Sequence, residues 1–388
     1  MSNARTYLDF NATAPLRPQT GAAMLAAIAC AGNASSVHRE GREARALIEA
    51  ARRDVAALAG VPAGGVVFTS GGTEAANLAL TPSLRIGRER RDFDLLLLSA
   101  GEHACVLQGH RFPAGQVITL PLQPSGRVDL TALEEILAER PGRHPLLALQ
   151  AANNETGVIQ PAAEAAARVR AAGGAIVCDA VQAFGRIPCR AEDLGADVLI
   201  LSAHKLGGPK GSGALAFVHE NDHIGDALVR GGGQERGQRA GTENVPAIAG
   251  FGAAVQAASR LLGSEAARTR DLRDRLEETV LRLAPDAVIF GADVERLPNT
   301  SCFAVPGASA ETLLMALDLD GVAVSSGSAC SSGKVGKSHV LAAMGVEPPI
   351  AKGAIRVSFG WSSSEADVEH FAGAFGTAIE RIHRRRAA

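Results

Sequence analysis

A lysine and an aspartate follow two apolar runs of the sequence and could bind a charged cofactor. Lys205 comes shortly after the run 198–201 and precedes a glycine-rich stretch, whereas Asp179 ends the run 175–178. Because open α/β sheets bind ligands at the carboxyl ends of their strands, both side chains are expected at one sheet edge. Lysine forms Schiff bases with aldehyde cofactors, and a buried carboxylate needs a cationic partner such as a protonated pyridine nitrogen. Taken alone, Lys205 could instead be a solvated loop lysine, and Asp179 could instead cap a helix.

A glycine-rich turn at residues 70–74 has the form of a phosphate-binding site. The turn, SGGTE, follows the apolar run 66–69 and opens the helical pattern EAANLAL. Backbone N–H groups at a helix N-terminus bind phosphate. An ordinary strand-to-helix turn also uses glycine, so this motif alone does not decide between the two interpretations.

One cysteine lies among small residues, which is unusual for a structural thiol. Cys330 lies in the stretch SSGSACSSG, whereas a buried structural cysteine would prefer apolar neighbours. We interpret this segment as a mobile loop carrying a nucleophile. The six cysteines show no C-x-x-C pairing, which argues against a disulfide framework and a zinc site.

Two further motifs resemble a P-loop and a zinc site, but neither is complete. Residues 336–338, GKS, resemble the end of a P-loop, but position 331 is serine where that motif needs glycine. His103 and Cys105 lie close together, yet no C-x-x-C completes a zinc-deaminase pattern, so we expect no catalytic metal. The basic residues 383–386 are interpreted as a solvated helix end.

The pattern of elements predicts an α/β fold with a large and a small domain. Apolar runs at 66–69, 95–99, 146–150, 175–178, 198–201 and 214–218 alternate with helical patterns at 44–58, 131–139 and 162–171. Such alternation indicates a mainly parallel sheet with helices on both faces. A charged helical stretch at 261–283 precedes shorter runs at 288–290, 302–305 and 355–359, which predict a small α+β domain. We place the large domain at 18–260 and the small domain at 1–17 and 261–388.

Composition and charge favour small-molecule chemistry in a cytoplasmic protein. The formal net charge of the 388 residues is −2, so no strong overall field attracts nucleic acid or an anionic membrane. The first residues show no secretion signal, and no apolar run is long enough for a membrane helix.

The sequence resembles the class V aminotransferase family of pyridoxal-phosphate enzymes, and within it the cysteine desulfurases that feed iron–sulfur cluster assembly. The resemblance covers nearly the whole chain and implies the aspartate aminotransferase-like fold, also called fold type I. The stretches that carry it are, in order, YLDFNATAPL, FTSGGTEAANLAL, EHACV, NNETGVIQP, CDAVQAFG, LSAHKLGGPKGSGAL, GGGQERGQRAGTEN, SSGSACSSG and IRVSFG.

This resemblance implies a role for each matched residue around pyridoxal phosphate. Lys205 would hold the cofactor covalently and act as the base, Asp179 would pair with the pyridine nitrogen, and Gln182 would contact the ring hydroxyl. His103 would stack on the ring and shuttle protons. Phosphate contacts are implied for Gly72, Thr73, Ser202 and His204, and for Thr242 from a second subunit, which implies a homodimer.

The resemblance also implies the reaction and the substrate contacts. Asn154 would lie near cofactor and substrate, and Arg356 would bind the carboxylate of L-cysteine. Cys330 would take the sulfur as a persulfide, leaving alanine, and pass it to an acceptor protein such as an iron–sulfur scaffold. No resident metal is implied, although Cys330 could transiently share a cluster iron.

Three alternatives stay open at this point: a selenocysteine lyase, an ordinary aminotransferase, and a non-catalytic sulfur-relay protein. Cys330 favours desulfuration because amino transfer needs no thiol, and Lys205 with Asp179 argues against a mere relay. Ala34 and Gln234 depart from the commonest family pattern, with little consequence. The chain ends at RIHRRRAA, without the extension that some relatives use for docking, so the sulfur acceptor remains open.

Overall fold

A seven-stranded sheet forms the centre of the protein. The computed structural model describes residues 5–87, 91–326 and 337–387. In spatial order the strands are β2 (Val66–Thr69), β9 (Gly213–Phe217), β8 (Val198–Ser202), β7 (Ala175–Asp179), β6 (Pro145–Gln150), β4 (Leu95–Ser99) and β5 (Val117–Leu120). β9 runs antiparallel to β2 and β8, and the remaining neighbours are parallel. The predicted mainly parallel sheet is confirmed, although β5 was not predicted.

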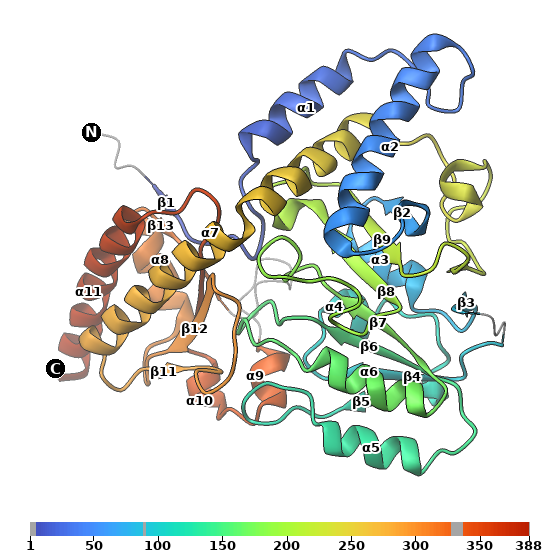
Figure 1. The fold of residues 1–388 in the computed structure, drawn as a ribbon. Helices are drawn as coiled ribbons and strands as arrows, with labels where there is room; N and C mark the ends of the chain where they lie inside the picture. The colour runs from blue at the N-terminus through green and yellow to red at the C-terminus, as the bar shows by residue number, and fades with distance from the viewer. Residues whose placement is uncertain (1–4, 88–90, 327–336, 388) are drawn as a thin grey trace.

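Helices cover both faces of this sheet, as predicted. Alternate residues of a strand point to opposite faces, so each strand contributes to two apolar cores. One core contains residues of α2 (Arg39–Ala59), α5 (Leu130–Ala138), α6 (Ala162–Ala171) and α7 (Val245–Leu283). The other contains residues of α3 (Gly72–Ala79) and α4 (Ala104–Leu107). Figure 1 shows α6 in front of the strands and α2 above them.

A smaller antiparallel sheet follows, with its own apolar core. Its strand order is β11 (Val288–Ile289), β12 (Thr300–Ala304), β15 (Ala354–Ser358) and β14 (Ser325–Ser326). It packs with α8 (Ala310–Leu319), α11 (Glu365–Ala387) and the C-terminal part of α7, at the left of Figure 1. β1 (Thr6–Tyr7) pairs with β13 (Val322–Ala323), so the N-terminal residues join this part of the chain. The remaining elements are α1 (Pro18–Ile28), β3 (Leu84–Arg85), β10 (His223–Ile224), α9 (His339–Ala343) and α10 (Pro348–Ala351).

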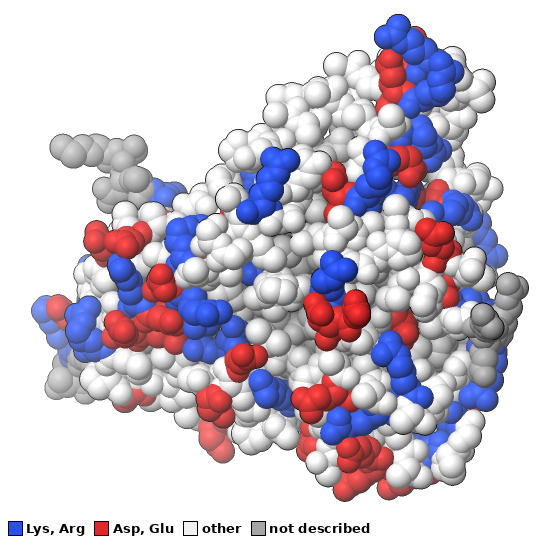
Figure 2. All heavy atoms as spheres, in the orientation of Figure 1, with Lys and Arg blue, Asp and Glu red and all other residues white. Residues whose placement is uncertain are grey.

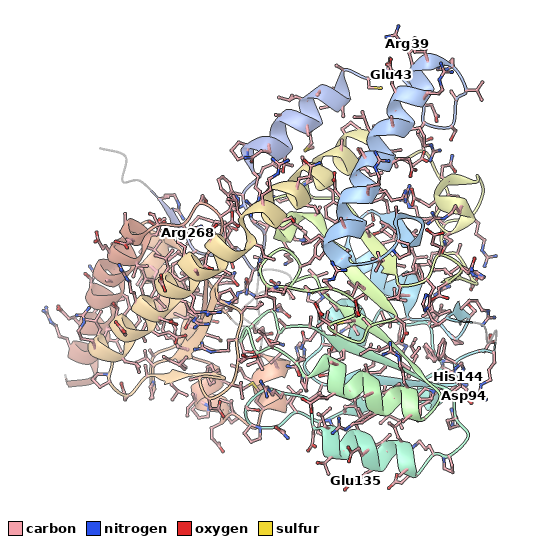
Figure 3. The ribbon with its side chains drawn as sticks, viewed as in Figure 1. Arg39, Glu43, Asp94, Glu135, His144 and Arg268 are labelled. Carbon is pink, nitrogen blue, oxygen red and sulfur yellow. The ribbon has the colours of Figure 1, made fainter. Side chains whose placement is uncertain are left out.

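Helix α7 connects the two parts without interruption. Asn244 caps its first turn by accepting a hydrogen bond from the N–H of Ala247 at 3.1 Å. Residues up to Ala258 are buried in the core of the large sheet, and residues from Leu272 onward are buried in the second core. Arg268, labelled in Figure 3, donates hydrogen bonds to the carbonyl oxygens of Gly360 and Trp361 just beyond β15. We retain the boundary at 260/261 as a proposal, with a continuous helix crossing it.

Among the described residues, α7 also meets the length and hydropathy expected of a membrane span. Half of the apolar window concerned is buried inside the protein. Phe251 and Val255 of α7 lie in the same core as Ile48 of α2. A buried core helix of this kind satisfies the same criteria, so the apolar character of α7 is explained by packing.

Charged side chains of both signs are interspersed on the face shown in Figure 2. Ion pairs between such residues include Arg168 with Glu134 and Arg170 with Asp197. This distribution agrees with the small net charge of the sequence.

Candidate active site

A cavity of about 240 Å³ lies at the carboxyl ends of β6, β7 and β8 and gathers most of the predicted site residues. This is the edge at which open α/β sheets bind ligands. Strand ends and the turns after them bring together positions that lie more than a hundred residues apart in the chain. The lining residues are Gly72, Thr73, His103, Cys105, Gln150, Ala152, Asn154, Asp179, Val181, Gln182, Ser202, His204 and Lys205.

Lys205 is placed in the cavity by the end of a buried strand. β8 ends at Ser202, and a single 3₁₀ turn, Ala203–Lys205, carries the lysine away from the sheet edge. Its Nζ atom donates hydrogen bonds to the carbonyl oxygens of Asn11 at 2.5 Å and Ala12 at 3.0 Å. The amine is therefore oriented by main-chain acceptors of the N-terminal segment.

Asp179 presents a buried carboxyl group at the end of β7. Burial raises the pKa of Asp179 to about 6, although a hydrogen bond from the N–H of Val181 and the charge of Lys205 oppose the rise. Glu102 is also buried nearby, and burial together with the charge of Asp179 raises the pKa of Glu102 well above its usual range. A cationic group beside Asp179 would relieve this cost, which is what a protonated pyridine nitrogen supplies.

Replacing Asp179 by asparagine is expected to stabilise the apoprotein and weaken cofactor binding. The raised pKa means that the folded wild-type chain loses stability as pH rises from about 4 to about 6, and the full loss persists above that range. This loss is about 3 kcal/mol, because two pKa units correspond to about that free energy. Thermal unfolding of apoprotein at pH 8 should show the variant as more stable, with a smaller difference at pH 5. Added pyridoxal phosphate should stabilise the variant less than the wild type; equal stabilisation of both would contradict the role of Asp179.

Two histidines in the cavity are held neutral. His103 caps α4 by accepting a hydrogen bond from the N–H of Cys105 at 3.2 Å. Burial, followed by the charges of Lys205 and His339, lowers the pKa of His103 to about 4. Burial and the charge of Lys205 likewise lower the pKa of His204 to about 4. Neutral imidazoles can stack on an aromatic ring, and the lowered pKa values keep both histidines unprotonated near neutral pH.

The other end of the cavity has the features of an anion site. Gly72 and Thr73 begin α3, and Ser202 and His204 line the same side. The N–H groups and dipole of a helix N-terminus favour negative charge. A Cβ atom on Gly72 would lie 3.1 Å from the Val181 side chain and 3.5 Å from that of Ser202, so a larger residue would crowd this wall.

These donor types fit pyridoxal phosphate. Lys205 matches the aldehyde, Asp179 matches the ring nitrogen, and the start of α3 matches the phosphate. The three groups line one cavity, so a single small molecule could contact all of them.

Arg356, the predicted substrate-carboxylate residue, does not line this cavity but contacts its border. Its guanidinium donates to Asp9 Oδ1 at 2.8 Å and to the carbonyl oxygen of Asn154 at 2.9 Å. The Arg356 Nε atom is buried and has no hydrogen-bond partner within the described part of the chain. The role of Arg356 in binding the substrate carboxylate stays a prediction.

Thr242 also lies apart from the cavity within this chain. It is exposed in the loop before α7 and borders a separate depression with Ser70 and Glu243. Buried Glu235 anchors this loop through an ion pair with Arg52, with atoms 2.7 Å apart. The prediction that Thr242 serves a second subunit stays untested by a single chain.

Cys330 lies outside the described residues, but its neighbours in the sequence border the site. On one side, Ser325 of β14 is in register with Arg356 of β15. On the other side, Ser338 donates a hydrogen bond of 2.5 Å to Glu155, the residue after Asn154. The role of Cys330 therefore stays a prediction.

Several residues around the site were not assigned roles from the sequence. They are Asp9, Asn11, Glu102, Gln150 and Arg186. Asp9, Asn11 and Arg186 form hydrogen bonds with predicted residues. The charge of Asp179 acts on Glu102, and Gln150 lines the cavity. Asp9, Asn11 and Glu102 fall within stretches that carry the family resemblance, and this was the one signal that could have indicated them.

Comparisons with known proteins agree with this geometry. The family Aminotransferase class-V matches residues 6–371. A cysteine desulfurase of Cereibacter sphaeroides is 42% identical over 371 residues, covering 94% of this chain and 93% of the relative. An IscS-like cysteine desulfurase of Mycobacterium tuberculosis is 39% identical, covering 97% of each chain. The solved structure of a NifS-like protein from Rickettsia africae is similar with a TM-score of 0.87 and 34% identity, covering 97% of this chain and 99% of that one. This likeness confirms the predicted fold class.

Proposed function

Because the chain belongs to the class V aminotransferase family, we propose that it is a pyridoxal-phosphate-dependent cysteine desulfurase that converts L-cysteine to L-alanine. The observation that carries the proposal is the cavity in which Lys205, Asp179 and His103 meet the N-terminus of α3. Pyridoxal phosphate, when bound, supplies an electron-withdrawing ring that stabilises negative charge at the substrate Cα.

The residues of this chain would bind and orient the reactants. Lys205 would hold the cofactor through its aldehyde and would act as the base for the Cα proton of the substrate. Asp179 would pair with the ring nitrogen and favour its protonated form, and His103 would move protons between the reactants. Arg356 would bind the substrate carboxylate, since arginine suits charge-assisted binding of carboxylates.

Cys330 would carry the sulfur out of the site. Its thiolate attacks the substrate sulfur, and an S–S bond forms as the Cβ–S bond breaks. The electron pair of the broken bond remains with the carbon skeleton, which is protonated and leaves as alanine. L-cysteine and the Cys330 thiol thus give alanine and a persulfide on Cys330. The attack requires Cys330 to be deprotonated, because the thiolate is the nucleophile.

We further propose the setting of the reaction: a homodimer in the cytoplasm, in which Thr242 of one subunit reaches the phosphate of the other. The persulfide would supply an acceptor protein for iron–sulfur cluster assembly or a related thiolation. Relatives named cysteine desulfurase at about 40% identity support the proposed activity.

Parallel assays with L-cysteine and L-selenocysteine test the proposal. With a thiol reductant, we expect equal amounts of alanine and sulfide from cysteine. Turnover of selenocysteine alone would instead indicate a selenocysteine lyase. Transfer of the amino group of cysteine to an added keto acid, without release of sulfide, would indicate an aminotransferase.

A further inference from the structure

The N-terminal segment at Asn11 joins the two parts of the active site. The Asn11 side chain is buried, with 1% of its surface exposed. Towards the small sheet, its Nδ2 donates to Thr300 Oγ1 at 2.9 Å, and its backbone N–H donates to Ser358 Oγ at 2.9 Å. Thr300 and Ser358 lie at the ends of β12 and β15, next to the strand position of Arg356. Asn11 is therefore fixed to the strands that carry the predicted substrate arginine.

The same residue contacts the cofactor side of the cavity. The carbonyl oxygen of Asn11 accepts hydrogen bonds from Lys205 Nζ at 2.5 Å and from Gln182 Nε2 at 3.1 Å. Its Nδ2 also donates to the carbonyl oxygen of Asn154 at 3.2 Å. One buried asparagine thus touches three residues that line the cavity.

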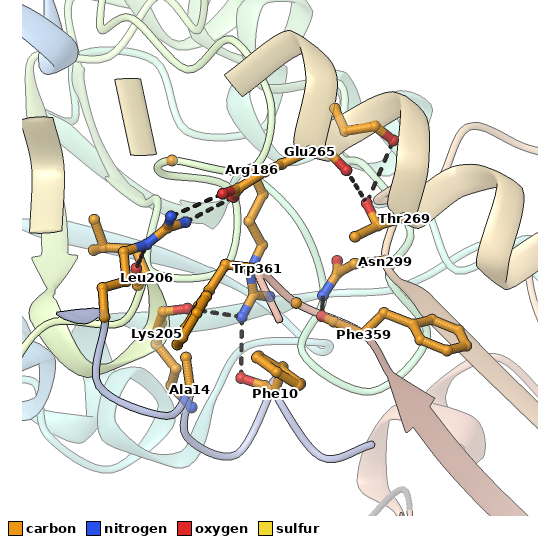
Figure 4. Close-up of a pocket in the computed structure, with 14 residues that line it drawn as sticks. Phe10, Ala14, Arg186, Lys205, Leu206, Glu265, Thr269, Asn299, Phe359 and Trp361 are labelled. Atoms are coloured by element: carbon orange, nitrogen blue, oxygen red, sulfur yellow. Dashed lines mark hydrogen bonds and ion pairs between the residues drawn. The ribbon is translucent and has the colours of Figure 1, made fainter. Parts of the chain in front are cut away.

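Arg186 extends this contact through four neutral oxygens. Its Nη1 donates to Asn11 Oδ1 at 2.7 Å and to Gln182 Oε1 at 2.6 Å. Its Nη2 donates to the carbonyl oxygens of Phe10 at 3.1 Å and Lys205 at 3.0 Å, as Figure 4 shows. Within the described ranges, no carboxylate lies within ion-pair distance of Arg186. Burial and the charge of Arg356 lower the pKa of Arg186 to about 9.

These bonds fix the orientation of two amide groups. Arginine has only donors, so the oxygens of Asn11 and Gln182 must both face the guanidinium. The NH₂ group of Gln182 is then directed to the Asn11 carbonyl, and its second hydrogen is left for another acceptor. Loss of either oxygen would leave a buried guanidinium short of acceptors, a costly arrangement.

We propose that Asn11 is a positioning residue that, together with Arg186, fixes Lys205 and Gln182 relative to the strand that carries Arg356. The inference rests on the proposed function, which gives Lys205, Gln182 and Arg356 their roles. Asn11 does not itself react. It keeps the cofactor anchor and the substrate-carboxylate site in register across the boundary between the two sheets.

The test compares Asn11→Leu with the matched control Gln160→Leu. Gln160 is buried and also uses both ends of its amide, bonding the N–H of Val128 and the carbonyl oxygen of Gly126, neither of which lines the cavity. In holoenzyme, Asn11→Leu should shift the pH midpoint of the cofactor absorption by about one unit and raise KM for cysteine about tenfold. Gln160→Leu should lower the thermal unfolding midpoint while leaving both values unchanged. Equal absorption midpoints and KM values in the two variants would overturn the inference.

Arg186→Gln provides the second arm of the test. It should shift the pH midpoint of the cofactor absorption and raise KM for cysteine. Because the two residues act as one unit, the double variant with Asn11→Leu should show changes no larger than those of the more affected single variant. Effects that multiply in the double variant would overturn the coupling. If Asn11→Leu does not fold, unchanged values in Arg186→Gln alone would overturn the inference. A wild type that binds no cofactor or releases no sulfide would instead refute the proposed function.

Discussion

Replacing Lys205 by alanine is expected to abolish covalent binding of pyridoxal phosphate and to slow sulfide release by at least about 10³-fold. The residue supplies both the covalent anchor and the base, so one substitution removes two contributions to the rate. Among the described residues that line the cavity, Lys205 is the one lysine, so no other side-chain amine is available there. Absorption spectra of the purified variant and a sulfide assay measure the two losses separately.

Lys210→Ala is the matched control for this variant. Lys210 lies five residues further along the same glycine-rich stretch and is exposed, outside the cavity. We expect it to retain the wild-type spectrum and rate. If Lys205→Ala kept the visible absorption of wild type after dialysis, another amine would be the anchor.

Replacing Cys330 by alanine is expected to preserve cofactor absorption while lowering sulfide release by about 10²-fold or more. The substitution removes the sulfur acceptor but none of the described groups that line the cavity. Cofactor binding should therefore be retained while sulfide release is lost. Equal cofactor content in variant and wild type, together with loss of alanine and sulfide, is the expected combination. The measurement requires a thiol reductant, which regenerates the free thiol in the wild type.

Cys105 is the competing thiol, because it lines the cavity beside His103. Burial and the charges of Asp179 and Glu102 raise the pKa of Cys105 far above its usual value, which disfavours the thiolate. Cys105 is therefore a poor nucleophile in this setting. Full turnover by Cys330→Ala combined with its loss in Cys105→Ala would reverse the assignment.

Most strands of the large sheet were predictable because they are short, mainly apolar runs whose residues are all buried. β2 and β4 match their predicted bounds, and β6, β7 and β8 differ only at an end. β5 was not predicted although three of its four residues, VITL, are apolar; it is an edge strand, and three of its residues are only partly buried or exposed.

The continuity of α7 could not be read from the sequence for a different reason. Its first half contains Gly250 and Gly252, which are typical of loops. In the structure they allow close packing: a Cβ atom on Gly250 would lie 2.6 Å from Met24 of α1, and one on Gly252 would lie 2.7 Å from Ala51 of α2. Contacts between helices, rather than helix propensity, decide these two positions.

The candidate site likewise has a part that the sequence predicts and a part that only the fold shows. Lys205, Asp179 and Gly72 follow strands directly, so strand positions alone predict that they meet. The contacts of Asn11 with Gln182 and of Asp9 with Arg356 join positions 171 and 347 residues apart. Hydrogen bonds between such distant positions leave no spacing pattern in a single sequence, which is why these partners were found only in the fold.

Borohydride reduction of the purified protein with pyridoxal phosphate tests the central claim most directly. The account predicts one reduced cofactor adduct per chain, located by mass spectrometry on the peptide that contains Lys205. An adduct on another lysine, or none, would contradict the claim that Lys205 anchors the cofactor.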